Sequence, residues 1–514
     1  MSTYVVVAAE RIQPWLELTH RLRLMRGASR MLTDCTHADR IEPVVSAAGG
    51  RLAHDEAGNI AGIVVFTVED PANALEAGRA VLRHLNLELP LLQWSVWSQQ
   101  GDSYVDAYDD FVRSQRPPDV RFRAAGLDLT VAAWCPGCGA EPAMHGGPVD
   151  RLNRDSADSD EPPDRPYGPG CARRYLTHDA ISNEQKSLTP RRARDFEELA
   201  LRGVPSAEGE RQAVGRKDSR SHLAVIAADG NSMGAWFTAL REHATHSGDR
   251  ELLARASARV DRAIKTAARA ASSHVNQGEV PAVVYPVERQ YLGGDDLLVS
   301  LPAVLAWEFA HAVATSFAQI TGRLSAALAN RALPAPTLGI GIAFAHRAHP
   351  FAQSRAQAES AMQAAKRRGQ GLESWIGFRD LTVDGEDSWN LGPDTREGVH
   401  VVSLADIGAD LGDPGSRRSR TLTLPPHAQA QLAGLLREGF GTPAGSARNR
   451  VAAVERHRGR LEQVGDVIEP PVEPTEEAAA EWLSGLESLL VRARWWPREP
   501  RRYQPSGQRE ESPC

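Results

Sequence analysis

Short apolar runs alternate with segments of helical spacing along most of the chain, and this pattern predicts an α+β fold. The pattern is clearest over residues 222–380. The strands predicted there cover residues 223–228, 282–287, 297–301, 338–345 and 374–378, and the helices cover 232–246, 249–275, 303–331 and 354–368. This β-α-β-β-α-β order with one late additional strand is typical of a ferredoxin-like sheet.

The segments around this block differ from it in composition. Residues 1–130 predict a small α/β unit, with strands at 4–9 and 60–68 and helices at 12–32 and 72–85. Residues 131–203 hold the central cysteines and a polar, proline-rich stretch at 150–169, and the charged segment 204–221 is predicted to be a linker. The second unit is expected to extend over 222–400. A helical region follows at 401–496, with helices near 426–440, 445–464 and 475–496, and a loose tail at 497–514.

Composition narrows the class of protein. The 514 residues suffice for three or four domains, and 42% hydrophobic residues indicate a globular chain. The 59 basic and 66 acidic residues give a net charge of −7, whereas a protein that grips nucleic acid alone is usually basic. No signal peptide and no apolar run of membrane-spanning length is recognisable, and five cysteines do not make a disulfide framework. We therefore expect a cytoplasmic protein whose nucleic-acid partners are held with the help of other subunits.

Three carboxylates are expected to meet at one end of the predicted sheet. Asp229 ends the first strand of the block, and Asp295 and Asp296 follow Gly293 and Gly294 at the tip of a hairpin. In a ferredoxin-like sheet these two sites lie at the same end. Carboxylate oxygens suit Mg²⁺ (or Mn²⁺), and paired ions can activate a hydroxyl and stabilise a leaving pyrophosphate. Neighbouring residues of a strand face opposite sides, so Asp229 and Asp296 rank slightly above Asp295 as metal ligands.

A nucleotide-binding role is predicted for residues next to these carboxylates. Gly230, Asn231 and Ser232 stand at a strand-to-helix junction, Gly293 and Gly294 allow close approach of a triphosphate, and Lys366 near a helix end is placed to meet a phosphate. The alternative for the hairpin is a merely polar turn. The matching neighbours, which include the strand at 339–346, disfavour that alternative.

The central cysteines have the spacing of a metal knuckle. Cys135 and Cys138 form a Cys-x-x-Cys pair, and Cys171 lies on a second turn. With His145 or His178 as a fourth ligand they would hold a structural zinc ion. The alternative is a remnant that packs without metal.

In this order and spacing, the block resembles the cyclase-like palm of the large, polymerase-related subunit of type III CRISPR effector complexes. The matching stretches are 225–234, 291–298, 338–346 and 364–366. The block is more distantly similar to GGDEF diguanylate cyclases, which carry Glu where Asp296 stands. Residues 12–13 and 26–32 look like the opening of the first palm of the same family, with a degenerate hairpin near 57–59.

The resemblance implies two ferredoxin-like palm domains, a zinc-ribbon-like insertion and a C-terminal helical domain. It implies a metal-dependent nucleotidyltransferase that makes cyclic oligoadenylates from ATP. It also implies other type III effector subunits, guide RNA and target RNA as partners, and no membrane. The catalytic residues carried over are Asp229, Asp295 and Asp296.

The chain also departs from the family pattern. No N-terminal HD nuclease domain is recognised, and the His54-Asp55 and His178-Asp179 pairs are interpreted as chance, so no DNA cleavage is expected. Asn231 replaces a frequent Asp and Gly339 a common Ser. A stand-alone cyclase that makes a cyclic di- or trinucleotide, and a catalytically silent scaffold, remain alternatives. The basic, aromatic stretch at 492–503 is interpreted as a helix end docked by Trp495 and Trp496, with RNA binding as the alternative.

Overall fold

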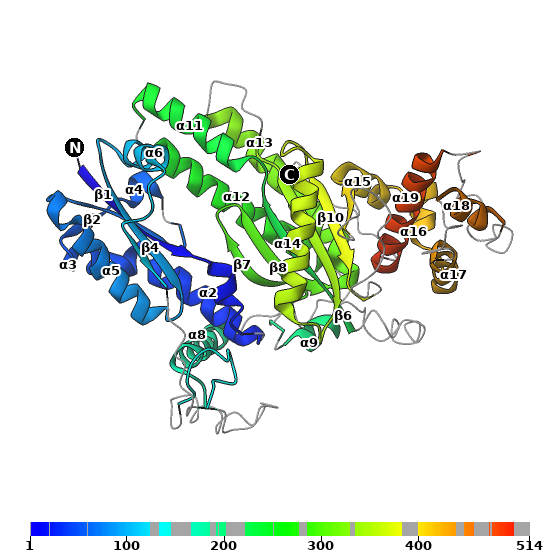
Figure 1. Ribbon diagram of the computed structural model, residues 1–514, viewed down its shortest axis with the longest axis horizontal. Coiled ribbons are helices and arrows are strands. Elements are labelled where there is room, and N and C mark those ends of the chain that lie inside the picture. The colour runs from blue at the N-terminus through cyan, green and yellow to red at the C-terminus, as the bar shows by residue number, and fades with distance from the viewer. Residues whose placement is uncertain are drawn as a thin grey trace, which may run out of the picture.

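Two β-sheets, each covered by helices, and a C-terminal group of helices make up the protein (Figure 1). The computed structural model describes residues 2–19, 21–58, 60–123, 133–144, 166–185, 192–193, 195–201, 221–249, 251–276, 285–328, 335–382, 399–437, 447–456, 472 and 475–497. Among the helices of these residues, none has the length and apolar composition that a membrane crossing requires.

The first sheet has the strand order β2-β3-β1-β4-β5. Its strands are β1 (Ser2–Glu10), β2 (Gly50–Leu52), β3 (Ile63–Val68), β4 (Gln93–Gly101) and β5 (Val120–Phe122). One face packs on α1 (Ile12–Leu16), α2 (Leu22–Thr36), α3 (Ala38–Ala47) and α5 (Ala74–Glu88). The other face packs on α4 (His54–Ala57) and α6 (Tyr104–Ser114). The order β4-β1-β3-β2 is ferredoxin-like, as predicted.

The helix predicted over 12–32 is wrong in one respect, because the chain breaks it into α1 and α2. The hydroxyl oxygen of Thr19 accepts a hydrogen bond from the backbone N–H of Arg21 at 3.2 Å. Such local bonds compete with the helical ladder. Helical spacing alone does not reveal this break, since the apolar residues on both sides face the same core.

The second sheet has six strands in the order β11-β10-β9-β6-β8-β7. They are β6 (His222–Gly230), β7 (Glu288–Gly293), β8 (Asp296–Pro302), β9 (Leu338–His346), β10 (Trp375–Asp380) and β11 (His400–Ser403). Central β6 runs antiparallel to both β8 and β9. The core on one face involves α11 (Met233–Ser247), α12 (Leu252–Val275) and, after the short η4 (Ala303–Leu305), α13 (Ala306–Leu328). The other face packs on α14 (Phe351–Arg368) and on Met25 of α2.

The strand predicted over 282–287 is wrong for its described part, because β7 begins only at Glu288. Residues 282–284 lie outside the described residues. Pro286 has no N–H for a strand ladder, which explains why pairing starts after it. The apolar run had suggested a strand, whereas the actual strand carries the polar residues that follow.

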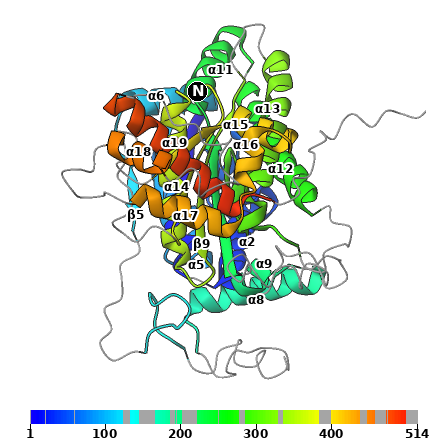
Figure 2. The same cartoon turned by 90° about the vertical axis from the view of Figure 1, so that its right-hand side faces the viewer.

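In the chain, α8 (Pro169–Gln185) and α9 (Phe196–Leu201) come between the strands of the first sheet and those of the second. Helix α8 packs so closely on α2 that a Cβ at Gly27 would overlap the carbonyl oxygen of Arg174. Figure 2 shows α8 at the foot of the molecule, away from the C-terminal helices. The predicted loop at 150–169, linker at 204–221 and tail at 497–514 lie almost entirely outside the described residues.

The C-terminal helices match the three predicted ones. They are α17 (Pro426–Arg437), α18 (Ala447–Arg456) and α19 (Glu476–Trp495), and they share their own small core. Two short helices, α15 (Leu404–Gly412) and α16 (Arg417–Leu422), connect them to the second sheet.

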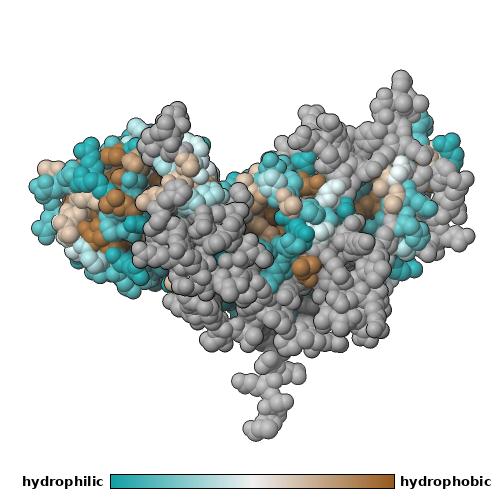
Figure 3. Space-filling model, turned by 90° about the horizontal axis from the view of Figure 1, so that it is seen from below, coloured by the Kyte–Doolittle hydropathy of each residue, from teal (hydrophilic) through white to brown (hydrophobic). Residues whose placement is uncertain are grey.

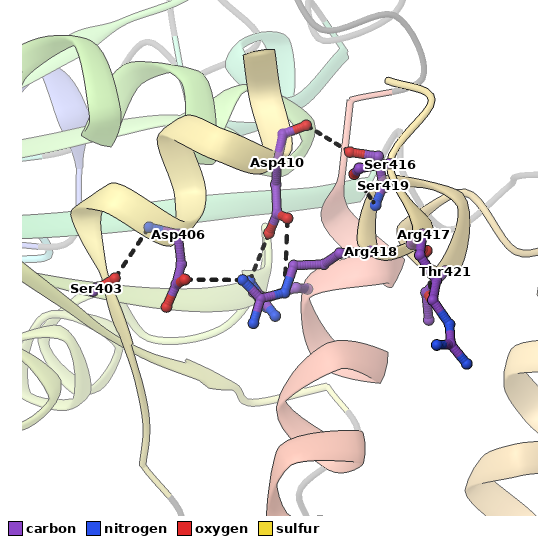
Figure 4. A network of polar contacts seen from close by, with 9 residues as sticks. Ser403, Asp406, Asp410, Ser416, Arg417, Arg418, Ser419 and Thr421 are labelled. Carbon is purple, nitrogen blue, oxygen red and sulfur yellow. Dashed lines mark hydrogen bonds and ion pairs between the residues drawn. The ribbon is translucent and has the colours of Figure 1, made fainter. Parts of the chain in front are cut away.

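A charged network at this connection is drawn in Figure 4. Buried Asp410 of α15 accepts a hydrogen bond from Arg492 of α19 at 3.0 Å. Arg418 of α16 lies 3.0 Å from Asp406 and 3.7 Å from Asp410. The hydroxyl of Ser419 donates to the backbone carbonyl of Asp410 at 2.7 Å. Three helices are therefore joined at one buried carboxylate.

The end of α19 is docked on the second sheet by tryptophans, as the docking interpretation predicted. Trp495 and Trp496 are 1% and 2% exposed. The Trp495 ring stacks on Phe344, and its Nε1 donates to Asp380 at 2.8 Å.

Among the described residues, ion pairs that each have an arginine from one sheet unit and a carboxylate from the other join the two units. Arg26 of α2 pairs with Glu288 of β7, and its Nε lies 2.6 Å from the carboxylate. Arg355 of α14 pairs with Glu17, and Arg241 of α11 lies 3.0 Å from Asp109 of α6. Since Arg26 and Glu288 are 5% and 2% exposed, this pair is shielded from solvent.

Replacing Arg26 with Met is expected to destabilise the protein by about 3 kcal/mol, because Glu288 would keep an uncompensated charge in the interior. Arg192, 3.9 Å from Glu288, compensates it only in part. The measurement is urea unfolding. The control is Arg30→Met on the same helix, where the side chain is 51% exposed and a loss below about 0.5 kcal/mol is expected. Equal losses in both variants would contradict the prediction.

Candidate functional site

The pairing of β6 with β8 brings the predicted carboxylates to one end of the second sheet. Asp229 is the penultimate residue of β6, and Ala228 pairs with Leu297 directly after Asp296. Gly293 pairs with Asp296, so Gly294 and Asp295 form the turn between β7 and β8. Gly294 has φ +66°, a conformation that side-chain-bearing residues seldom adopt. The tight turn therefore requires glycine here and places Asp295 and Asp296 beside Asp229.

Gly230 lets Asp295 approach the end of β6. A Cβ at Gly230 would lie 2.6 Å from Oδ2 of Asp295 and would overlap the Met233 side chain. Any larger residue at position 230 would push the turn away. The described neighbours of Gly230 are Asp295, Met233 and, at its carbonyl oxygen, Lys366. Its nucleotide-binding role stays a prediction.

Crowding and burial raise the pKa of two of the carboxyl groups. Desolvation, the charge of Asp229 and a hydrogen bond with Asp229 raise the pKa of Asp295 to about 6. Desolvation and the charges of Asp229 and Asp295 raise the pKa of Asp296 to about 8. Lys366 lowers both pKa values, but to a smaller extent. The site therefore favours an added positive charge.

Lys366, predicted to meet a phosphate, contacts the carboxylates in this structure. Its Nζ donates to Oδ2 of Asp229 and, at 3.0 Å, to the backbone carbonyl of Gly230. The lysine stem crosses Gly339 of β9, where a Cβ would lie 2.5 Å from Cγ of Lys366. The serine common at this position in the family would obstruct this path.

Asn231 and Ser232 occupy the junction between β6 and α11. The Asn231 amide nitrogen donates to the Thr337 hydroxyl at 2.9 Å and to the Glu373 carbonyl at 3.1 Å. Its buried Oδ1 has no hydrogen-bond partner among the described residues. Ser232 is exposed, has φ +54° and donates to the Gly371 carbonyl at 2.7 Å. The exposed first turn of α11 is suited to a phosphate, because its N–H groups point outward.

The carboxylates supply the hard oxygen donors that Mg²⁺ prefers. Asp229 is the shared member, since it exchanges a hydrogen bond with both Asp295 and Asp296. The three carboxylates do not each bring an oxygen within 4.8 Å of the others; in the described chain only the cysteine group does so. The chemistry of this donor set fits a divalent cation.

Asp261 and Tyr291 are two residues of this site that the sequence did not single out for a role. The backbone N–H of Gly294 donates to Asp261 of α12 at 3.2 Å. Burial and the charges of Asp296, Asp295 and Asp261 raise the pKa of Tyr291 well above its usual value. The sequence shows that Asp261 and Lys265 are four residues apart on a predicted helix. It does not show which turn of the protein that helix contacts.

The three cysteines meet as their spacing predicted. The sulfur atoms of Cys135, Cys138 and Cys171 all lie within 4.8 Å of one another. Backbone N–H groups point at two of them, from Gly137 to Cys135 at 3.4 Å and from Ala140 to Cys138 at 3.5 Å. Hydrogen bonds from the other two cysteines hold the pKa of Cys135 far below its usual value. Three cysteine sulfur atoms this close together fit three ligands of a structural zinc site.

Neither proposed histidine joins the sulfur atoms in the described structure. His145 lies outside the described residues. His178 stands two turns after Cys171 on α8, about 10 Å along the helix, and is not part of the group. Burial and the nearby Arg26, Arg23 and Arg192 lower the pKa of His178 to about 3. The other His-Asp pair, His54 and Asp55, is largely exposed on α4.

The comparisons with known proteins agree with this geometry. The family model described as Cas10/Cmr2, second palm domain, matches residues 222–371. This segment is therefore similar to the second palm domain of Cas10/Cmr2. The match confirms the resemblance inferred from the sequence, and it covers the strands and helices that carry Asp229, the Gly293–Asp296 turn and Lys366. No curated protein sequence matches the chain.

Solved structures resemble the fold over nearly the whole chain. One of them is a Csm1–Csm4 cassette in complex with one ATP, with a TM-score of 0.55 and 14% sequence identity. The matched region covers 96% of this chain and 70% of the other chain. A Csm1–Csm4 cassette in complex with cA3 has a TM-score of 0.53 and 13% sequence identity. This match covers 97% of this chain and 70% of the other chain. Csm1 in T. onnurineus has a TM-score of 0.50 and 13% sequence identity, and the match covers 96% of this chain and 69% of the other chain. The Cas10/Cmr2 palm and the first sheet therefore sit in a Csm1-like fold.

Replacing Asp296 with Asn is expected to raise the melting temperature of the metal-free protein at high pH. Because the folded-state pKa is raised, proton binding stabilises the fold at low pH, and that stability is lost as pH rises toward about 8. The melting-temperature difference between variant and wild type should widen from pH 5 to pH 8 and reach about 2–4 °C. Asp34→Asn, on an exposed face of α2, is the control. A difference that narrows over this range would contradict the assigned repulsion.

Proposed function

We propose that the Cas10/Cmr2 palm is a metal-dependent nucleotidyltransferase that makes cyclic oligoadenylates from ATP. The observation that carries this proposal is the convergence of Asp229, Asp295 and Asp296, two of them with raised pKa values, beside Lys366. Structural relatives hold ATP or cA3, which supports the same class of ligand here. The proposed setting is a cytoplasmic type III CRISPR complex with guide RNA and target RNA.

The reaction joins the 3′-hydroxyl oxygen of one ATP to the α-phosphorus of another. The bond to pyrophosphate breaks, and the hydroxyl proton is released to solvent. Mg²⁺ or Mn²⁺ at the carboxylates would supply positive charge to the phosphates and lower the pKa of the hydroxyl. Asp229, Asp295 and Asp296 are assigned to hold the cation. Lys366 can turn from Asp229 toward a phosphate, and the exposed start of α11 offers N–H donors. Gly293 and Gly294 leave the turn without side chains that would obstruct a triphosphate.

Two alternatives are weaker. A silent scaffold has no need for three crowded carboxylates, whose mutual repulsion works against folding. A stand-alone cyclase has no need for the first sheet, the cysteine insertion and the C-terminal helices. The relatives that are Csm1–Csm4 cassettes support other effector subunits as partners of this chain.

The test is incubation of the complex with labelled ATP and Mg²⁺, with and without target RNA. We expect cyclic oligoadenylates with target RNA, and a loss of about 10³-fold in the Asp295→Ala/Asp296→Ala variant. Asp55→Ala, which removes an 85% exposed carboxylate, is the matched control and should keep full activity. Product without RNA would favour the stand-alone cyclase. No product from ATP or GTP in the intact complex would refute the catalytic proposal.

We also infer that the cysteine group holds a structural zinc ion. Elemental analysis of protein purified without chelator should give about one zinc per chain, and Cys171→Ser should lose it. Cys35→Ser is the control, because Cys35 lies on α2 outside the sulfur group. Wild-type protein without zinc would support the metal-free remnant instead.

A further inference from the structure

Helix α12 touches both the first sheet unit and the carboxylate turn of the palm (Figure 1). Near its start, Ala254 and Ser257 face Gly58. Farther along, Asp261 and Lys265 face the turn. The spacing of three and four residues between successive members places all four on one side of the helix. Seven residues separate Ala254 from Asp261, a rise of about 10 Å.

At the palm end, a hydrogen bond ties the turn to the helix. The N–H of Gly294 donates to Oδ1 of Asp261 at 3.2 Å, while Oδ2 of Asp261 is held by Nζ of Lys265 at 2.7 Å. Lys265 therefore orients the carboxylate that accepts from the turn. Because Gly294 has no side chain and nothing lies within 4 Å of its Cβ position, packing does not hold the turn at this residue.

At the other end, α12 rests on the part of the first unit that corresponds to the palm hairpin. A Cβ at Gly58 would lie 3.7 Å from Cβ of Ser257 and 3.9 Å from Cα of Ala254. The preceding helix α4 is fixed to its own sheet, because Glu56 accepts hydrogen bonds from the Tyr4 hydroxyl at 2.9 Å and the Tyr104 N–H at 2.8 Å. Gly58 is therefore a near neighbour of α12, and a shift of the first unit toward this helix would bring the two into closer contact.

We propose that Asp261 is a positioning residue for the Gly293–Asp296 turn, and that α12 transmits the placement of the first sheet unit to it. The proposal rests on the proposed function of the palm, whose site it regulates. A displaced turn separates Asp295 and Asp296 from Asp229 while the phosphate-facing residues of α11 and α14 stay in place. The turnover rate should therefore change more than the affinity for ATP.

The first experiment compares Asp261→Ala, Asp261→Asn and the control Asp34→Ala in the full chain. Asp34 also belongs to an i,i+4 ion pair and is 29% exposed, against 31% for Asp261. Hydrogen exchange of the Gly294 amide should accelerate about tenfold in Asp261→Ala, because its acceptor is removed. Asp261→Asn keeps an acceptor oxygen and should recover most of the protection. If the Gly294 amide exchanges in Asp261→Ala at the same rate as in the wild type, the positioning role is overturned.

The second experiment tests transmission along the helix. Ser257→Gln enlarges the contact with Gly58, whereas Ala258→Gln enlarges its exposed neighbour. Ser257→Gln should accelerate exchange at Gly294 severalfold although it does not touch the turn, and Ala258→Gln should not. Equal exchange in the two variants would overturn transmission through α12.

Kinetics in the intact complex separate this proposal from the proposed function. Asp261→Ala should lower kcat about tenfold with a smaller change in the KM for ATP, and Asp261→Asn should restore most of the lost kcat. An equal rise of KM would overturn positioning in favour of a binding role. If wild type makes no product, the proposed function fails, while the exchange of the Gly294 amide still decides whether Asp261 positions the turn.

Discussion

The antiparallel pairing of β6 with β8 is the constraint on which the palm site depends. It fixes which end of the central strand meets the hairpin, and so sets Asp229 against Asp295 and Asp296. A slip of one residue would turn the apolar side chains of β6 to the wrong face of the sheet. The same register that builds the core on both faces therefore also builds the carboxylate group, and neither can change without the other.

The pairing also gathers negative charge at a cost to the fold. Burial and mutual repulsion raise the pKa of both hairpin carboxyl groups, which means that their ionised forms oppose folding. Elsewhere the protein matches buried charges with partners, as in Arg26 with Glu288 and Arg492 with Asp410. Lys366 offsets the repulsion only in part. Such an imbalance is typical of a site that binds a cation, because a bound ion would relieve it.

Much of this was predictable from sequence because the relevant signals are local. The spacing of apolar residues along the chain predicted the strands and helices of the second sheet. The ferredoxin-like order of these elements then predicted that Asp229 lies near the hairpin. The close approach of Cys135 and Cys138 could be predicted from their Cys-x-x-Cys spacing. What could not be read depends on contacts between distant segments, such as Asp261 with Gly294 or Thr337 with Asn231. The strand at 282–287 failed because an apolar run resembled a strand although Pro286 stood in it.

The docking of Trp495 on Phe344 has a consequence for the order of folding during synthesis. Phe344 lies on β9 next to the central strand, and its partner is translated some 150 residues later. Until then the ring of Phe344 and the neighbouring His222 have no cover from Trp495. Contacts over such a separation form late and leave apolar surface open on the nascent chain. The palm sheet therefore completes its packing only after the last described helix has left the ribosome, and until then this face is open to misassembly.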